Sequence, residues 1–241
     1  MTYCLGIKLD QHMIFVSDSR TSAGFDNVST YSKMWRFGAV GLRKFVLCSA
    51  GNLATTQAVV TILKNDIEQN AAINLMNIKS LHEGAEYIGK ISVECQNKNT
   101  GGGPLFETTF LFGGEIAGSL SEMYMIYSQG NFISSSTQVP FLQIGEFKYG
   151  KPILDRVIKE NTPLERAVVC ALVSMDATIK SNIAVGPPIE LFVMDIGSLN
   201  AGRYLKFEED DMYLRDLRNA WNSLMQEAMD KLQAPVMNGM P

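Results

Sequence analysis

Hydrophobic and polar positions alternate at the start of the chain, in the pattern of half-buried β-strands. Across residues 3–9 the odd positions are apolar and face one way, and a second apolar run covers residues 13–16. These two runs are close enough in sequence to predict a β-hairpin. Two further strand-like runs cover residues 31–37 and 45–49.

The hydrophobic period changes from 2 to 3.6 after the corner at Ala50-Gly51, which indicates a helix. The apolar stripe of this helix consists of Leu53, Ala54, Ala58, Val59, Ile62, Leu63 and Ile67. A second helix is predicted over residues 81–94. The segment 97–104, which contains consecutive glycines at 101–103, then interrupts the regular pattern.

The rest of the chain repeats the succession of strands and helices. Strands are predicted over residues 108–112, 123–128, 141–144, 189–194 and 204–207, and helices over residues 151–159 and 213–232. One more helix is predicted to open at Thr162-Pro163-Leu164-Glu165 and to run to about Met175 or beyond. There Thr162 is the expected N-cap, Pro163 fits the first helical position and Glu165 fits the third.

The predicted order is strands, two helices, strands, two helices, strands and a final helix. It lacks the strict alternation of strand and helix that marks a parallel sheet, so we expect an α+β fold with two antiparallel sheets between helical layers. A chain of 241 residues is long enough for one substantial core. We therefore expect one domain over residues 1–233 and a loose, flexible C-terminal tail over residues 234–241.

Composition narrows the classes of function. The formal net charge of -4 and the pI near 5.3 argue against a nucleic-acid partner, which normally needs a basic patch. No run approaches the ~20 apolar residues of a membrane span, so we expect no membrane partner and a cytoplasmic location. The four cysteines are far apart, which suggests buried free thiols rather than a zinc cage or disulfides. Charged residues make up 19% of the chain against a usual ~25%, which leaves weakly polar surface for contacts between subunits.

Candidate chemistry is limited because familiar motifs are missing. The sequence has no G-x-x-x-x-G-K-[ST] loop, no G-x-S-x-G elbow and no H-E-x-x-H pair. Only His12 and His82 are available for a histidine-based triad or metal site, and no cofactor or metal is expected. A free α-amino group with a pKa near ~8 can replace histidine as the base for an adjacent hydroxyl. Thr2 follows Met1 and carries both groups once Met1 is removed.

Several segments in register make the first third of the chain distinctive. They are Thr2-Tyr3-Cys4-Leu5-Gly6, Val16-Ser17-Asp18-Ser19-Arg20, Ser29-Thr30-Tyr31-Ser32-Lys33-Met34 and Ser49-Ala50-Gly51-Asn52-Leu53-Ala54-Thr55-Thr56. With them the chain resembles the β-type subunits of proteasomes, and most closely the bacterial proteasome-related family called Anbu, the ancestral β-subunit family. The resemblance covers nearly the whole chain. Segments 127–131 and 173–182 look like later active-site segments of that family.

The resemblance implies an N-terminal nucleophile (Ntn) hydrolase fold, a four-layer αββα sandwich, with its active site at Thr2. Thr2 would attack the scissile carbonyl through its hydroxyl, and its own amine would relay the proton. Lys33 would hold positive charge beside Thr2, and Asp18 would pair with Lys33 and keep it charged despite burial. Arg20 would brace the same corner, and the Gly51 backbone N–H would point at the developing oxyanion.

Three further site residues are implied by the resemblance. Asp176 and Ser181 correspond to the acid and the hydroxyl that position the Thr2 amine, and Ser128 belongs to a later active-site segment. Proteasomal β-subunits typically carry Asp-x-x-Ser followed by two glycines. This chain instead has Asp176-Ala177-Thr178-Ile179-Lys180-Ser181-Asn182, a spacing that displaces Ser181 from the family pattern.

Three functions stay open on the sequence alone. The leading one is hydrolysis of peptides or unfolded proteins by a subunit that self-associates into a ring-like or helical homo-oligomer, with an unfoldase partner left open. Because no propeptide precedes Thr2, no self-cleavage is expected. The second is a catalytically silent scaffold subunit in which retained Met1 masks the amine, and the third is an Ntn amidohydrolase acting on small amides.

Four of the candidate residues also have a purely structural interpretation. Without Thr2 nearby, Asp18 and Lys33 would form an ordinary ion pair. Gly51 would serve only as the turn residue of a strand-to-helix corner, and Asp176 as a surface or capping residue.

Overall fold

The computed structural model of the chain describes residues 1–22, 28–98 and 104–235. Contacts divide the chain into two units, residues 1–209 and residues 210–241. The glycines at 101–103 and the end of the expected tail, both singled out in the sequence, lie outside the described residues.

In its described part, the first unit contains two antiparallel five-stranded sheets and a small two-stranded one. The first sheet has the strand order β10 (Phe141–Gly145), β1 (Tyr3–Lys8), β2 (His12–Asp18), β11 (Ile189–Asp195) and β12 (Arg203–Phe207). The second has the order β5 (Met34–Ala39), β6 (Arg43–Gly51), β7 (Thr108–Ile116), β8 (Glu122–Ile126) and β9 (Phe132–Ser134). The small sheet pairs β3 (Arg20–Ser22) with β4 (Val28–Thr30). The predicted hairpin is confirmed, since β1 and β2 pair with Cys4 opposite Ser17.

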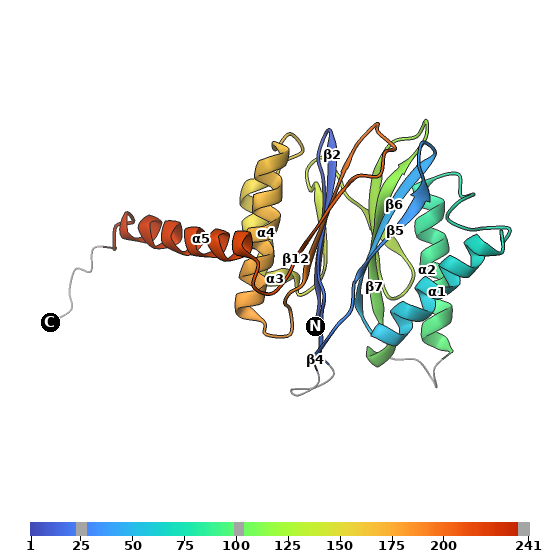
Figure 1. Ribbon diagram of the computed structural model, residues 1–241, viewed down its shortest axis with the longest axis horizontal. Coiled ribbons are helices and arrows are strands. Elements are labelled where there is room, and N and C mark those ends of the chain that lie inside the picture. The colour runs from blue at the N-terminus through green and yellow to red at the C-terminus, as the bar shows by residue number, and fades with distance from the viewer. Residues whose placement is uncertain (23–27, 99–103, 236–241) are drawn as a thin grey trace. The chain divides into compact units, whose positions relative to one another are not determined.

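Helices cover the outer face of each large sheet (Figure 1). The second sheet carries α1 (Leu53–Glu68) and α2 (Leu81–Asn97), and the first carries α3 (Phe147–Val157) and α4 (Leu164–Ser181). Buried side chains of the predicted α1 stripe pack in the core beneath the second sheet, as Leu63 does within the cluster that holds Phe112. A second core, which includes Phe15 and Val46, fills the space between the two sheets. The predicted α+β architecture of four αββα layers is confirmed.

The start of α4 differs from the prediction. Pro163 rather than Thr162 is the N-cap residue, and no side-chain bond caps this helix. The Thr162 hydroxyl accepts a hydrogen bond from the Lys159 N–H at 2.8 Å and lies 3.4 Å from the Val157 carbonyl oxygen. Thr162 therefore closes the turn that follows α3, because its oxygen is already bound to the preceding residues.

The strand predicted from residue 31 begins only at Met34. The Tyr31 N–H, which lies before Met34, donates to the carbonyl of Ser19, the residue between β2 and β3, at 2.9 Å. Lys33 thus precedes β5 instead of lying in a strand, and its carbonyl accepts from the Ser49 N–H at 3.0 Å. The short strands β3, β4 and β9 were not predicted, since three residues show no readable period.

The second unit contains the predicted final helix, α5 (Met212–Asp230). Asp211 caps it, because the Asp211 carboxylate accepts a hydrogen bond from the Leu214 N–H at 3.1 Å. None of its residues is buried. Across the described residues of both units, no helix combines the length and the apolar character needed to cross a bilayer.

Candidate active site

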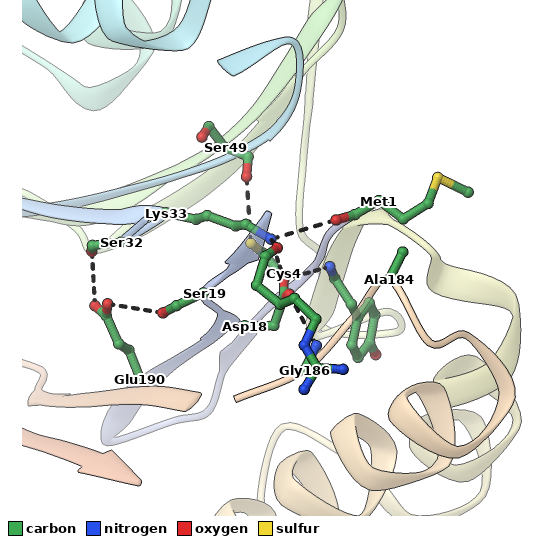
Figure 2. Close-up of polar contacts among 12 residues, drawn as sticks. Met1, Cys4, Asp18, Ser19, Ser32, Lys33, Ser49, Ala184, Gly186 and Glu190 are labelled. Atoms are coloured by element: carbon green, nitrogen blue, oxygen red, sulfur yellow. Dashed lines mark hydrogen bonds and ion pairs between the residues drawn. The ribbon is translucent and has the colours of Figure 1, made fainter. Parts of the chain in front are cut away.

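A buried carboxylate lies at the end of β2. Asp18 is fully buried, and its Oδ1 accepts hydrogen bonds from Lys33 Nζ at 2.8 Å and from the Tyr3 N–H at 3.0 Å. Its Oδ2 accepts a third from the Gly186 N–H at 3.2 Å (Figure 2). These donors satisfy the carboxylate on both oxygens, as a buried charge requires. The ion pair predicted from the sequence is therefore formed.

Lys33 is held by more than this one partner. Its side chain is 7% exposed, and Nζ also donates to the Arg20 carbonyl at 2.6 Å and to the Met1 carbonyl at 3.5 Å. The two shorter bonds fix the ammonium from the side of β2 and β3. The longest bond reaches the peptide group that joins Met1 to Thr2, so the charge of Lys33 lies next to the start of the chain (Figure 2).

Thr2 is held in place by its backbone. Its carbonyl accepts a hydrogen bond from the Glu146 N–H at 2.8 Å, just after β10. Gly145 makes this approach possible, because a Cβ at that position would lie 1.9 Å from the Thr2 oxygen, and its φ of +81° favours glycine. The position of the first residues thus depends on a glycine that the sequence analysis did not single out.

Thr2, Lys33 and Gly51 line one cavity of about 310 Å³. Its other lining residues are Met1, Thr21, Ser49, Ala50, Asn52, Leu53 and Thr56. A second cavity, of about 390 Å³, is also lined by Thr2 and Gly51, together with Gly145 and Glu146. The structure therefore brings three of the predicted site residues to one cavity, with Asp18 behind Lys33.

Gly51 occupies the corner between β6 and α1. Its φ is +119°, and an added Cβ would lie 2.3 Å from the Glu107 carbonyl oxygen. The next residue, Asn52, caps α1 by accepting a hydrogen bond from the Thr55 N–H at 2.9 Å. Glycine is therefore required here by the backbone alone, and the same lack of a side chain leaves its backbone open to the cavity.

Gly51→Ala is expected to lower the free energy of unfolding by about 2 to 5 kcal/mol, because it combines a disfavoured φ with overpacking against the backbone. Gly41→Ala is the matched control. Its φ of +79° is also positive, but nothing lies within 4 Å of its Cβ position, so only the backbone cost of about 1 kcal/mol should appear. Urea unfolding of the two variants measures the difference, and equal losses would show that contact with Glu107 is unimportant.

Arg20 braces the site through both its backbone and its side chain. Its carbonyl accepts from Lys33, while its guanidinium donates to the Ile183 carbonyl at 3.0 Å and approaches Glu209 at 3.4 Å. The guanidinium lies against Gly186, where an added Cβ would be 2.4 Å from Cζ. Arg20 therefore holds in place the segment after α4 that donates to Asp18.

Three predicted residues do not line either cavity. Asp176 is half-buried within α4, and Ser181 is exposed at the last residue of that helix. Ser128 lies in the turn between β8 and β9, where its carbonyl accepts from Gln96 Nε2 at 2.9 Å. None of these three is among the described residues that line the two cavities at Thr2. Their assignment to the site stays a prediction.

Burial raises the pKa of Asp18 above its ordinary value, and Lys33 with the Tyr3 and Gly186 N–H groups opposes that rise. The ionised form of this carboxyl therefore depends on its partners. Burial also raises the pKa of the neighbouring Cys4 thiol, whose Sγ donates to the Ser49 carbonyl at 3.6 Å. Cys4 is thus a protonated core thiol, and all four cysteines are buried thiols that form no disulfide, as predicted.

Sequence reasoning missed the groups that complete the site from distant parts of the chain. Gly145, Glu146 and Gly186 act through the backbone, and no side-chain pattern marks them. Glu190, on β11, is only 4% exposed, and it binds the two serines that flank the ion pair. A glutamate inside an otherwise apolar strand run was the signal for that residue.

Two antiparallel sheets between helical layers, with a threonine before the first strand and a buried lysine–carboxylate pair beside it, define the fold class of the Ntn hydrolases. The profile of the family described as Proteasome subunit matches residues 2–194. The chain belongs to the proteasome subunit family, and within it to the Anbu, or ancestral β-subunit, group.

Solved structures support this membership over nearly the whole chain. Anbu from Yersinia bercovieri is 38% identical, with a TM-score of 0.93 and coverage of 98% of this chain and 100% of that one. The helical assembly of the Anbu complex from Pseudomonas aeruginosa is 39% identical, with a TM-score of 0.93 and coverage of 98% of both chains. Anbu from Hyphomicrobium sp. strain MC1 is 36% identical, with a TM-score of 0.90 and coverage of 98% of this chain and 100% of that one. A comparison with curated proteins found no match.

Proposed function

We propose that this chain is a threonine peptidase subunit that hydrolyses peptide bonds with Thr2 as nucleophile once Met1 has been removed. The observation that carries the proposal is the ammonium of Lys33, which is fixed by Asp18 at 2.8 Å and lies beside the same cavity as Thr2. A buried cation next to a hydroxyl and a free amine lowers the free-energy cost of removing the hydroxyl proton.

The reaction follows from these groups. The Thr2 amine takes the proton from the Thr2 hydroxyl as Oγ bonds to the scissile carbonyl carbon, and the carbonyl electrons move to the oxygen. The Gly51 N–H stabilises that oxyanion, a contribution of ~3 kcal/mol for a preorganised donor. The tetrahedral intermediate then expels the leaving amine, which receives the proton from the Thr2 amine. Water cleaves the resulting ester and restores Thr2.

Removal of Met1 changes the hydrogen-bond partners of Lys33 in a way that favours the reaction. The Met1 carbonyl, which accepts from Nζ at 3.5 Å, departs, and the Thr2 nitrogen becomes a free amine. The bonds to Asp18 and Arg20 do not involve Met1, so the ammonium keeps its position. The same step creates the base and frees one N–H of Lys33 to face the reacting groups.

The substrate class and assembly are part of the proposal. We infer that peptides or unfolded proteins are the substrates and that the subunit forms a ring-like or helical homo-oligomer, as the helical assembly of the Pseudomonas aeruginosa relative suggests. Four buried cysteines in the thiol form fit the reducing cytoplasm.

Trapping with a peptidyl electrophile that acylates hydroxyl groups tests the nucleophile. After incubation with the purified, assembled protein, digestion and peptide mapping should place a single stoichiometric label on Thr2 of a chain that lacks Met1. Threonines outside the site, such as the exposed Thr61 on α1, should stay unlabelled. A label elsewhere, or none on a chain with a free Thr2 amine, would contradict the proposal.

A scaffold subunit without turnover is the second candidate, and it requires that Met1 is retained. With Met1 retained, the Thr2 nitrogen is an amide without basicity, and the Met1 carbonyl accepts a hydrogen bond from Lys33. Intact-mass measurement separates the two: a mature chain that keeps Met1 supports the scaffold. If Thr2 is free and reactive, assays on peptide libraries and on small amides distinguish a peptidase from an amidohydrolase.

A further inference from the structure

Glu190 is a buried carboxylate that the proposed reaction does not use. It lies on β11, where the adjacent residue Ile189 pairs with Asp18. It is 4% exposed. Its Oε1 accepts a hydrogen bond from the Ser19 hydroxyl at 3.2 Å, and its Oε2 accepts one from the Ser32 hydroxyl at 3.0 Å (Figure 2). Burial of an ionisable side chain is unfavourable unless its polar atoms are bound, and these two bonds engage both carboxylate oxygens.

The two serines are the chain neighbours of the ion pair. Ser19 follows Asp18 directly, and Ser32 directly precedes Lys33. One carboxylate thus connects the segment that carries the anion to the segment that carries the cation. Figure 2 shows Glu190 with its two serines on one side and the contacts of Asp18 and Lys33 on the other.

Backbone hydrogen bonds connect Ser19 to two other segments of the chain. Its N–H donates to the Gly186 carbonyl at 3.3 Å, and its carbonyl accepts from the Tyr31 N–H at 2.9 Å. Gly186 is also the residue whose N–H binds Asp18. A shift of Ser19 would therefore reach both the donor of Asp18 and the segment before Lys33.

We propose that Glu190 is a positioning residue for the site: by binding Ser19 and Ser32 it sets the separation of Asp18 and Lys33, and through them the place of the ammonium at Thr2. The proposal rests on the proposed function, because its first readout is the reaction at Thr2. It assigns no contact with substrate to Glu190, whose role is geometric. A displacement of about 1 Å at a reacting group can lower a rate by about a hundredfold.

The chain offers a matched control in Glu115. That side chain is 6% exposed on β7 and accepts from the Ser121 hydroxyl at 3.1 Å and from the Gly197 N–H at 3.0 Å. It pairs with Lys44, whereas the Gly51 end of β6 pairs with Thr108, so Glu115 lies at the opposite end of β7 from the site. Replacing either glutamate by leucine removes a buried carboxylate from a serine.

The test compares Glu190→Leu, Glu190→Gln and Glu115→Leu in the assembled protein lacking Met1. Glu190→Leu is expected to lower kcat and the rate of Thr2 labelling about 10- to 100-fold with KM within about twofold, since positioning rather than binding is lost. Glu115→Leu should leave kcat within about twofold. Glu190→Gln, which keeps one acceptor and turns the other contact around, should recover kcat to within about threefold of the unmodified chain. Equal kcat for Glu190→Leu and Glu115→Leu would overturn the proposal.

Serine variants and crystal structures test the proposal if Glu190→Leu does not fold or if the unmodified chain is inactive. If Glu190→Leu does not fold, Ser19→Ala and Ser32→Ala should each lower kcat, and combining either with Glu190→Gln should give less than the product of the separate losses. If the unmodified chain neither labels nor turns over, the proposed function fails, and crystal structures then test the positioning role alone. In Glu190→Leu the Lys33 Nζ should move away from its 2.8 Å contact with Asp18, and an unchanged contact would overturn it.

Discussion

Thr2→Ala is expected to abolish hydrolysis and labelling while the protein folds and assembles as before. The variant keeps the amine, Lys33 and the cavity, and it lacks only the oxygen that attacks. Turnover should fall to the background of the uncatalysed reaction, because the variant lacks the hydroxyl that belongs to the same residue as the free amine. Peptide cleavage and electrophile labelling measure the loss.

Retention of the fold follows from how Thr2 is held. The bond from Glu146 reaches the Thr2 carbonyl, and the bond to Asp18 starts from the Tyr3 N–H, so neither involves the Thr2 side chain. The Tm should change by less than about 4 °C, which corresponds to less than about 1 kcal/mol for a chain of this size. Thr61→Ala, on the exposed face of α1, is the control and should keep full activity. Residual activity in Thr2→Ala would remove Thr2 as nucleophile.

The hydrophobic pattern predicted the layers of this fold because the layers are what that pattern encodes. The alternation over β1 and β2 and the stripe of α1 each reflect one buried face, and these elements lie where predicted. The side-chain cap of a helix was predicted less accurately. The Thr162 hydroxyl had the right spacing for a cap, but the turn after α3 competes for it and binds it.

The residues of the site also divide into those that the sequence predicted and those that it did not. Thr2, Lys33 and Gly51 lie on segments whose motifs are contiguous, and the fold brings them to one cavity. Gly186 and Glu190 come from segments about 170 residues away from Asp18 and act through backbone N–H groups or serines, which carry no recognisable spacing. Long-range contacts of this kind depend on the pairing of β2 with β11, which are far apart in sequence, and not on any local pattern.

Lys33→Met is expected to lower the rate at Thr2 on the order of a thousandfold and also to destabilise the protein. The rate falls because the cation that favours loss of the hydroxyl proton is gone, and effects of positioned proton-transfer and charge groups are commonly 10²- to 10⁴-fold. The stability falls by about 3 to 5 kcal/mol, since Asp18 is left as a buried carboxylate without its cation. Kinetics of labelling and urea unfolding measure the two effects separately.

Lys44→Met is the control for loss of a buried lysine. Lys44 lies on β6, is 8% exposed and donates to the Ser198 carbonyl at 2.8 Å, at the end of the strand opposite Gly51. Its variant can lose stability but should keep the rate at Thr2 within a few-fold. A comparable loss of rate in both variants would mean that Lys33 acts only through folding.

The pH dependence of stability distinguishes an unpaired Asp18 from general damage. Burial already raises the pKa of Asp18 in the presence of Lys33, and removal of the cation raises it further above the ordinary value of ~3.9. The folded variant then binds a proton that the unfolded chain has released, so its stability is greatest at acid pH and falls as pH rises through the raised pKa. The deficit of Lys33→Met relative to the unmodified chain should therefore be smaller at pH 5 than at pH 7.5. A deficit independent of pH would show that Asp18 does not depend on Lys33 for its charge, and the ammonium would then lose its assigned anchor beside Thr2.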